Sequence, residues 1–295
     1  MSNVLGIEHP LILFKELDEA IARFKALGFS TTAVGRHPWG TSMSLAQFDR
    51  CSIELMSIYD EALIDERPAG DFRFGRYMRD RLREREGMSL VALFSDNAER
   101  DETVLRDRGI AVNGTIEFGR PVTLPDGREG RTATTLKTLF DPDLPRVSHF
   151  ICHQHRPEFI WVPEWLTHPN GAHGIARVTY FAPEPDAVRP RFSGLYGESA
   201  IAPSDGGMTV RTGNGTFEIL DEPGVERRFG RLPDAIREAG EPCGVAISVK
   251  VDDVENVTQR MRHAGVAHVV RDGSARIQRP EAYGNVWLEF VTSER

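Results

Sequence analysis

Apolar positions along the chain follow two alternating spacings, and their order predicts a recurring unit. Residues 6–13 (GIEHPLIL) are almost continuously apolar, which predicts a buried strand. Apolar residues then recur at helical spacing over 17–29, with a glycine near the end as is common where helices stop. Three short strands separated by turn residues are predicted at 30–38, 43–49 and 51–58. The first sixty residues therefore predict a strand, a helix and three strands.

The same order returns three times along the rest of the chain. Further first strands are predicted at 88–96, 174–182 and 244–251, and helical spacing follows each of them, at 97–110, near 186–197 and at 254–265. The remaining strands are predicted near 112–120, 131–140 and 147–155, near 201–204, 208–212 and 215–220, and at 266–273, 274–280 and 286–292. An internal repeat of this kind indicates modules that pack into a continuous core. The sequence thus predicts an α+β fold of four βαβββ modules, two in a domain at 1–160 and two in a domain at 161–295.

Two segments fall outside this pattern. Residues 61–86 carry mixed charge at helical spacing, which is typical of a solvated connecting helix. Residues 221–242 are rich in Pro, Gly and charge and predict a surface excursion.

Composition narrows the range of partners. With 40% hydrophobic and 27% charged residues the chain of 295 residues has the make-up of an ordinary soluble protein. Its net charge of −8 argues against nucleic acid or an anionic membrane as a partner. No apolar run approaches the roughly 20 residues that span a bilayer, and no signal peptide is expected at the N-terminus. The expected partner is a small-molecule substrate, with a homodimer as a further possibility.

Three widely separated cysteines, Cys51, Cys152 and Cys243, show no CxxC spacing. They predict neither a disulfide framework nor a cysteine zinc site. A reducing cytoplasm is the simplest setting for them, so a cytoplasmic location is expected.

A βαβββ unit with a histidine on its first strand and a glutamate on its last resembles the vicinal oxygen chelate superfamily. That superfamily includes glyoxalase I, methylmalonyl-CoA epimerase, extradiol ring-cleaving dioxygenases and metal-free drug-binding resistance proteins. The stretches RHPWGT (36–41), IEL (53–55) and 154–175 resemble its glyoxalase-like branch. The resemblance covers essentially the whole chain and implies that paired modules form a curved sheet around a cavity, but it leaves the reaction open.

The resemblance implies metal ligands on the first and fourth strands of each module. His9 and Glu54 match these positions in the first module. Imidazole and carboxylate suit Fe, Mn, Ni or Zn, and an open coordination position would take two adjacent oxygens of a substrate. The alternative is a strand histidine with structural partners and a buried carboxylate paired with an arginine. At the matched position of the second module stands Leu90, which cannot bind a metal.

The fourth strand of the second module is rich in histidine. Because side chains alternate along a strand, His149, His153 and His155 share one face. If that face lines the cavity, His153 or, slightly favoured, His155 completes a two-histidine, one-carboxylate metal set with His9 and Glu54. The other histidine, or Glu54, would then serve as acid or base. The alternative is a polar strand end where histidines are crowded by chance.

Residues near the predicted hairpin at 36–41 are candidates for substrate binding. Arg36 and His37 would hold an anionic or carbonyl group, and Trp39 would form a wall of the pocket. The alternative is a Pro–Gly hairpin with an exposed basic pair. His173, in a turn between the two halves, would reach the mouth of the cavity.

The third and fourth modules lack a recognisable metal set. Their first strands carry Arg177 and Val245 at the matched positions, and their fourth strands carry Glu218 and Glu289. These residues predict a charge cluster rather than a second metal site. The C-terminal half would then brace the catalytic half or mediate dimer contacts.

Together with these residues, the resemblance implies a divalent-metal-dependent enzyme of lyase or isomerase type, which would chelate a substrate through vicinal oxygens and stabilise an enediolate. One alternative is an Fe(II)-dependent ring-cleaving dioxygenase. The other is a metal-free protein that binds or sequesters small molecules.

Overall fold

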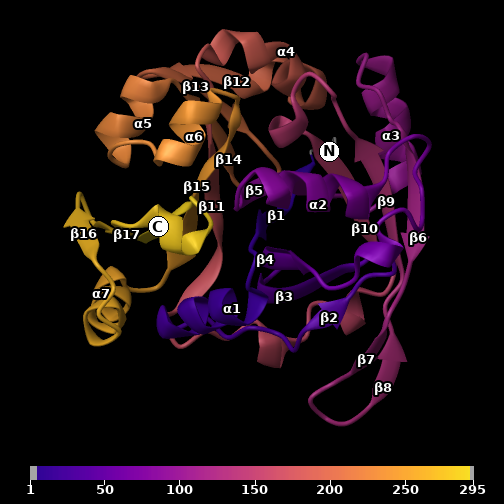
Figure 1. Cartoon of the computed structure of the whole chain (residues 1–295), viewed down its shortest axis with the longest axis horizontal. Coiled ribbons are helices and arrows are strands. Elements are labelled where there is room, and N and C mark those ends of the chain that lie inside the picture. The colour runs from indigo at the N-terminus through magenta and orange to yellow at the C-terminus, as the bar shows by residue number, and fades with distance from the viewer. Residues whose placement is uncertain (1–4, 293–295) are drawn as a thin grey trace.

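The computed structural model describes residues 5–292 and contains the four predicted modules in chain order (Figure 1). The first comprises β1 (Gly6–Leu13), α1 (Leu17–Ala26), β2 (Gly35–Arg36), β3 (Thr41–Phe48) and β4 (Cys51–Ile58). The second comprises β5 (Gly87–Phe94), α3 (Ala98–Asp107), β6 (Gly114–Phe118), β9 (Thr134–Leu139) and β10 (His149–Gln154). The third comprises β11 (Ala172–Phe181), α4 (Pro185–Tyr196), β12 (Ile201–Ser204), β13 (Gly207–Arg211) and β14 (Thr216–Leu220). The fourth comprises β15 (Cys243–Val251), α7 (Val254–His263), β16 (His268–Arg271), β17 (Ser274–Ile277) and β18 (Trp287–Thr292).

Two modules join edge to edge in each of two curved sheets. The strand order is β2-β3-β4-β1-β5-β10-β9-β6 in the first sheet and β12-β13-β14-β11-β15-β18-β17-β16 in the second. In both sheets the two central first strands run antiparallel, and each has the fourth strand of its own module as a parallel neighbour. The predicted α+β class and the paired, curved sheets are therefore confirmed. Each sheet lies within one of the two predicted halves of the chain.

Helix starts follow local sequence signals. Asn97 precedes α3, and its side-chain oxygen accepts a hydrogen bond from the backbone N–H of Arg100 at 2.9 Å. Asp253 precedes α7 and accepts from the N–H of Glu255 in the same way. Such caps satisfy backbone donors that the first helical turn leaves unpaired. No helix among the described residues is long and apolar enough to cross a membrane.

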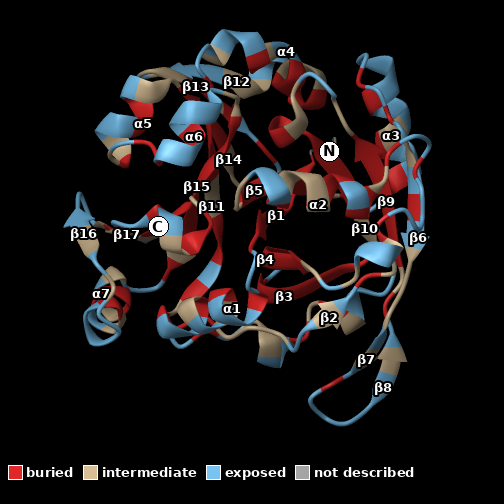
Figure 2. Ribbon diagram, viewed as in Figure 1, coloured by how far each residue is buried: buried red, intermediate tan, exposed pale blue. Residues whose placement is uncertain are grey.

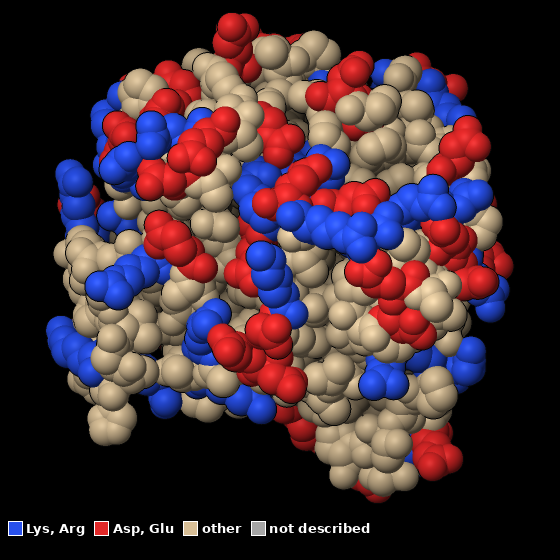
Figure 3. All heavy atoms as spheres, in the orientation of Figure 1, with Lys and Arg blue, Asp and Glu red and all other residues tan. Residues whose placement is uncertain are grey.

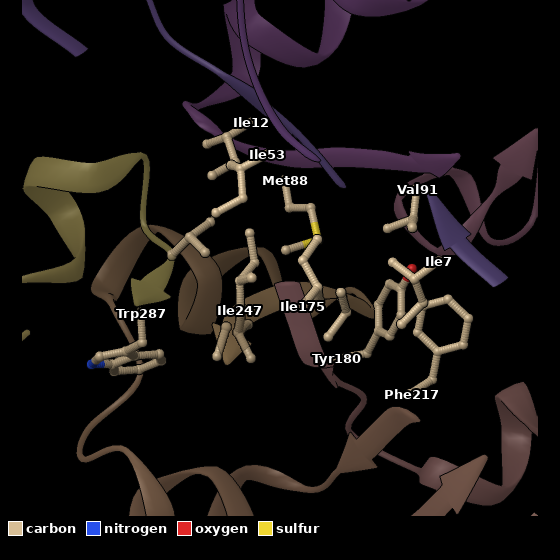
Figure 4. Close-up of a cluster of buried hydrophobic side chains, with 14 of the residues drawn as sticks. Ile7, Ile12, Ile53, Met88, Val91, Ile175, Tyr180, Phe217, Ile247 and Trp287 are labelled. Atoms are coloured by element: carbon tan, nitrogen blue, oxygen red, sulfur yellow. The ribbon is translucent and has the colours of Figure 1, made fainter. Parts of the chain in front are cut away.

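The two halves share one hydrophobic core. Buried side chains of the first sheet, such as Ile7, Met88 and Val91, meet buried side chains of the second sheet, such as Ile175 and Ile247 (Figure 4). The strands that carry them are buried along most of their length (Figure 2). A second, separate cluster of apolar side chains lies on the concave side of the first sheet. The first sheet is thus covered on both faces.

The predicted linkers contain helices that contribute to these cores. The segment at 61–86 holds α2 (Phe74–Glu84), which carries arginines on its outer face beside acidic neighbours (Figure 3). Its inner face packs on the concave side of the first sheet, and its buried residues are Phe74, Gly75, Tyr77, Met78 and Leu82. The expectation of a merely solvated helix is therefore wrong for that face. The segment at 221–242 folds into α5 (Glu222–Arg228) and α6 (Asp234–Ala239).

One hairpin was not predicted. β7 (Pro121–Thr123) and β8 (Glu129–Arg131) form a separate two-stranded sheet between β6 and β9. The residues at its base, Arg120 and Thr132, belong to the lining of the cavity described next.

Candidate functional site

The concave face of the first sheet lines a cavity beneath α2 and beside the β7–β8 hairpin. Aromatic rings form much of its wall, namely those of Trp39, Phe74, Phe118, Phe150 and Trp161. Polar side chains gather at one part of it, among them Glu8, His9, His37, Gln47, Glu54 and Arg120. An apolar hollow with a few convergent polar groups is the usual form of a small-molecule site.

A β-bulge places two consecutive residues of β1 on the cavity side. Ile7 pairs with Leu93 and His9 with Ala92, so Glu8 has no partner of its own on β5. A bulge of this kind alters the alternation of side chains. Glu8 and His9 consequently both line the cavity, although strict alternation would separate them.

His9 lies between two carboxylates. Its Nδ1 is 2.8 Å from Oε2 of Glu8, and its Nε2 is 3.0 Å from Oε2 of Glu54. Burial by itself would lower the pKa of His9, but the two negative charges raise it from 6.5 to about 10. Burial would raise the pKa of Glu54, but the hydrogen bond from His9 and its charge hold that pKa below 4.5. The arrangement therefore favours an imidazolium at His9 and an ionised carboxylate at Glu54 at neutral pH.

Several buried polar atoms around the cavity have no hydrogen-bond partner among the described residues. They include Oε1 of Glu54, Nε1 of Trp39 and Oε1 of Gln47. The three residues are 4%, 1% and 2% exposed. A buried polar atom without a partner is costly, so these atoms indicate a place where a ligand supplies the missing partners.

His37 and Arg120 complete the polar part of the cavity. The ring of His37 stacks on Trp39 with centroids 4.8 Å apart, and its Nδ1 is 2.9 Å from Oγ1 of Thr41. Burial, helped by the nearby charges of Arg120 and His9, lowers the pKa of His37 to about 4. Burial also lowers the pKa of Arg120, whose charge in turn contributes to the low pKa of Glu54. The cavity thus combines a charged His9 with a neutral His37.

Strand pairing shows what stands at the positions matching His9 and Glu54 in the second module. Glu54 lies opposite Leu11, two residues after His9. The same relation between β5 and β10 identifies Leu90 and Phe150. The rings of His9 and Phe150 meet edge to face with centroids 5.7 Å apart, so the two modules do meet at one place. In the second module, the apolar side chains of Leu90 and Phe150 therefore stand at the positions that His9 and Glu54 hold in the first.

This donor set does not fit the metal site that the resemblance implies. Such a site needs three or four protein ligands. His9 and Glu54 supply two, and Leu90 and Phe150, at the matching positions of the second module, supply none. Across residues 5–292, no three His, Cys, Asp or Glu side chains are placed to hold one ion together.

The histidines of β10 lie on the other face of the sheet from the cavity. Phe150, Cys152 and Gln154 line the cavity instead. His149 is buried in the core shared with the C-terminal half, where its Nε2 is 3.2 Å from the hydroxyl of Tyr180.

The two histidines proposed as ligands are held elsewhere. His153 accepts a hydrogen bond from the backbone N–H of Ala98 at 3.4 Å, and Nε2 of His155 is 2.7 Å from Oγ1 of Thr135. The expectation that His153 or His155 points at His9 and Glu54 is wrong, because the predicted alternation is correct but the cavity lies on the opposite face.

Of the four predicted substrate-binding residues, the structure brings two to the cavity. His37 and Trp39 line it as expected. Arg36 stacks over the ring of Tyr59 at 4.7 Å and borders a neighbouring hollow that shares Arg120 with the cavity. His173 lies away from the cavity, with its Nδ1 3.2 Å from the carbonyl of Gly171 and 3.5 Å from Asp252. The predicted roles of Arg36 and His173 at this cavity are therefore not supported by their positions.

Sequence patterns missed Glu8, Gln47 and Arg120. An acidic residue inside the apolar run GIEHPLIL was the available signal for Glu8. Arg120 stands in a loop beside an unpredicted hairpin, so no pattern indicated its direction.

The C-terminal half carries a charge cluster where the first half carries His9 and Glu54. Strand pairing identifies Arg177 and Glu218 as the matching residues of the third module, and Ala246 and Glu289 as those of the fourth. Val245, which was predicted at the matched position of the fourth module, lies one residue before Ala246 and belongs to the shared core. The predicted charge cluster is present, with one position corrected.

Arg228 of α5 lies between the two glutamates of this cluster. Its guanidinium donates to Glu218 at 2.6 Å and to Glu289 at 2.8 Å. The hydroxyls of Thr179 and Ser248 donate to the same two carboxylates, at 2.9 and 2.6 Å. The two carboxylates therefore share one protein cation.

Comparison with known proteins adds a family and a fold. The sequence pattern of the glyoxalase-like domain family matches residues 7–196. No curated protein matches the chain. A hypothetical protein from Staphylococcus aureus has a similar structure, with a TM-score of 0.68 and 12% identity over 98% of this chain and 100% of that one.

Two solved enzymes also share the fold. A triple mutant of 4-hydroxymandelate synthase from Streptomyces coelicolor matches with a TM-score of 0.56 and 13% identity, over 98% of this chain and 92% of the enzyme. A fusion protein of a xylose isomerase-like TIM barrel and a 4-hydroxyphenylpyruvate dioxygenase matches with a TM-score of 0.58 and 13% identity, over 98% of this chain and 48% of the fusion. At these identities the likeness concerns the fold alone.

Proposed function

The chain belongs to the glyoxalase-like domain family, and from this premise we propose that it is an enzyme that moves a proton on a small oxygenated organic molecule. The family and the vicinal oxygen chelate fold agree with the expected superfamily. The proposed reaction is of lyase or isomerase type and takes place in the cavity of the N-terminal half. The observation that carries it is the buried Oε1 of Glu54, which has no protein partner among the described residues and lines an otherwise largely aromatic cavity.

Glu54 is the proposed base. His9 holds its Oε2 at 3.0 Å, so the free Oε1 is the atom available to a substrate. Because His9 keeps the pKa of Glu54 low, the carboxylate is ionised at neutral pH, which is the form that a general base needs. His9 itself points both nitrogens at glutamates and acts as a positioning residue.

His37 and Arg120 are the proposed partners of the oxygen that becomes negative. Breaking a C–H bond next to a carbonyl sends the proton to Glu54 and the electron pair to the carbonyl oxygen. If the hydroxyl of Thr41 donates to Nδ1 of His37, the neutral ring carries its proton on Nε2 and donates from there. The guanidinium of Arg120 and the indole N–H of Trp39 are further donors at the cavity wall. Return of the proton to another carbon gives isomerisation, and departure of a neighbouring group gives a lyase reaction.

The pKa values of the two histidines support this division of roles. Neighbouring groups in one site hold different charges at the same pH when their environments move their pKa values apart. His9 is raised to about 10 and His37 lowered to about 4 within the same cavity. The proton transfer and the stabilisation of the oxygen described above use only side chains of this chain.

Aromatic oxo acids and hydroxy acids are the first molecules to test. 4-Hydroxyphenylpyruvate and 4-hydroxymandelate, which appear in the names of two proteins of similar fold, each have a ring and a carboxylate. The ring would pack on aromatic walls such as Phe74 and Phe150, and the carboxylate would meet Arg120.

The test is solvent exchange of the proton next to the oxygenated carbon, followed by NMR in D₂O. Glu54→Gln should lower an enzyme-dependent exchange rate by about 100-fold or more, because a general base contributes about that much. Glu19→Gln, an exposed change in the same half, is the matched control and should leave the rate unchanged. Undiminished exchange in Glu54→Gln would remove the proposed base.

The aromatic lining of the cavity favours one second candidate, a protein that binds such molecules without turnover. Binding of a probe by calorimetry with no exchange in the wild-type protein would support it. Activity that depends on stoichiometric ferrous iron and consumes oxygen would instead support the ring-cleaving dioxygenase alternative, so metal content is measured on the same sample.

A further inference from the structure

The C-terminal sheet has a concave, open hollow of its own, at the place that corresponds to the cavity of the first half. Six cationic residues line it: Arg177, Arg227, Arg228, Lys250, Arg271 and Arg276. Only two acidic residues, Asp272 and Glu289, belong to the lining. This concentration of positive charge stands out in a chain whose net charge is −8.

Strand register explains how the polar residues share one face. Arg177 pairs with Ser248, Ser248 with Glu289, and Glu289 with Arg276. Directly paired residues point to the same side of a sheet. The four residues therefore form one polar row across β11, β15, β18 and β17, and the row faces the hollow.

The carboxylates of this region are already neutralised within the protein. Glu218 and Glu289 share Arg228, and Arg177 approaches Glu218 at 3.9 Å. At the rim, Arg227 pairs with Asp205 at 3.1 Å and Arg271 pairs with Asp272 at 3.1 Å. Even when all four acidic residues are counted against the six cations, an excess of two positive charges remains.

Two of the cations have no carboxylate within ion-pair distance among residues 5–292. Lys250 has only a long contact of its Nζ with the carbonyl of Asn214, at 3.5 Å. Arg276 donates to the carbonyl of Arg228, and its buried Nε has no hydrogen-bond partner. The buried Nε of Arg177 also lacks a hydrogen-bond partner. Unsatisfied donors on a concave face are suited to an anionic ligand.

We propose that this hollow, centred on Arg177, Lys250 and Arg276, is a second ligand site and binds small molecules that bear a phosphate group. Guanidinium groups match the geometry of phosphate oxygens, and an ammonium group such as that of Lys250 adds a point charge. The hydroxyls of Ser248 and Ser274 lie in the same lining. The site is separate from the acid–base cavity and does not depend on the function proposed for it.

The test is calorimetric titration of the full chain with inorganic pyrophosphate at low ionic strength, since salt weakens binding of this kind. Lys250→Gln should weaken binding about tenfold, the effect of losing one charge-assisted hydrogen bond. Arg189→Gln removes the same charge from a half-buried residue of α4 outside the hollow and should leave the affinity unchanged.

A second variant covers the case in which Lys250→Gln folds poorly. Ser274→Asp places a negative charge in the lining without removing a cation, and it should also weaken binding about tenfold or more. The proposal is overturned if pyrophosphate does not bind the wild-type chain at low salt. It is equally overturned if Arg189→Gln loses as much affinity as Lys250→Gln, because the attraction would then come from the general surface charge.

Discussion

His9 is held by two glutamates, and this determines which atoms of the cavity remain available. Both ring nitrogens face carboxylate oxygens, at 2.8 and 3.0 Å. The imidazolium therefore has no lone pair to offer, whereas Glu54 keeps one unpaired oxygen. A buried charge is stable only when it is paired. Removing any one of the three side chains would therefore leave a buried charge without its partner.

We predict that His9 stays doubly protonated across neutral pH. Its folded-state pKa of about 10 lies above the ordinary value of 6.5. The stability that the His9 charge contributes is therefore fully present below pH 6.5 and is lost as the pH rises through 10. Imidazole ¹⁵N shifts should report a charged ring at pH 8.

Glu8→Gln tests the cause of that shift. Glu8 is the largest charge that raises the pKa of His9, so its removal should move the titration of His9 to lower pH. The free energy of unfolding should then begin to fall at a lower pH than in the wild-type protein. Glu19→Gln, on the exposed face of α1, should change neither curve. A neutral His9 ring at pH 7 in the wild-type protein would contradict the assignment.

At the scale of elements, strand register determines which side chains meet. The pairing of β1 with β5, and of β5 with β10, brings His9 next to Phe150. In a complete metal site, Leu90 and Phe150 would be replaced by a second pair of ligands. Leu90 and Phe150 are 3% and 2% exposed and fill that space with apolar surface. The difference between a metal site and this cavity thus lies in two side chains of the second module.

We predict that the double substitution Leu90→His with Phe150→Glu creates a binding site for a divalent ion such as Ni²⁺. Without metal, loss of the Phe150 side chain should lower the free energy of unfolding by about 3–5 kcal/mol. Ni²⁺ should restore part of it, because a ligand that binds only the folded state stabilises it. Metal content after dialysis and the melting temperature with and without Ni²⁺ are the measurements.

The two single substitutions are the controls and should bind Ni²⁺ more weakly than the double variant. If the double variant binds no more Ni²⁺ than the wild-type protein, then the matched positions derived from strand pairing are wrong.

The order of elements could be predicted from the sequence, because strand and helix spacings are local. The direction in which a strand faces could not. Both faces of β10 are buried, one by the cavity and α2 and the other by the shared core, so hydropathy does not distinguish them. His149 shows this most clearly, since it is 1% exposed on the face away from the cavity. The bulge that brings Glu8 beside His9 likewise depends on pairing with β5, which no local pattern encodes.

At the scale of the whole molecule, the two halves use the same architecture for different charge arrangements. The first has a histidine between glutamates, and the second has Arg228 between glutamates. Between them lies one core to which both sheets contribute (Figure 4). Because each cavity is built on the concave face of a sheet whose other face belongs to that core, changes in the core should affect both halves.

We predict that Gly244→Ala destabilises both halves together. Gly244 lies on β15, and a Cβ there would clash with Sδ of Met88 and lie 2.9 Å from its Cγ. Met88 belongs to β5 of the other half and is 1% exposed, so it has little room to move. Overpacking of this kind costs about 1–3 kcal/mol.

Gly174→Ala is the matched control in the neighbouring strand β11. A Cβ at Gly174 would meet only Cδ of Lys250, at 3.5 Å, which is an ordinary contact. Urea unfolding should therefore show a loss for Gly244→Ala and little change for Gly174→Ala. Hydrogen exchange should show the loss in β5 as well as in β15, because the clash lies where the two sheets meet. Exchange that rises in the C-terminal half alone would mean that the halves unfold independently, in spite of the core they share.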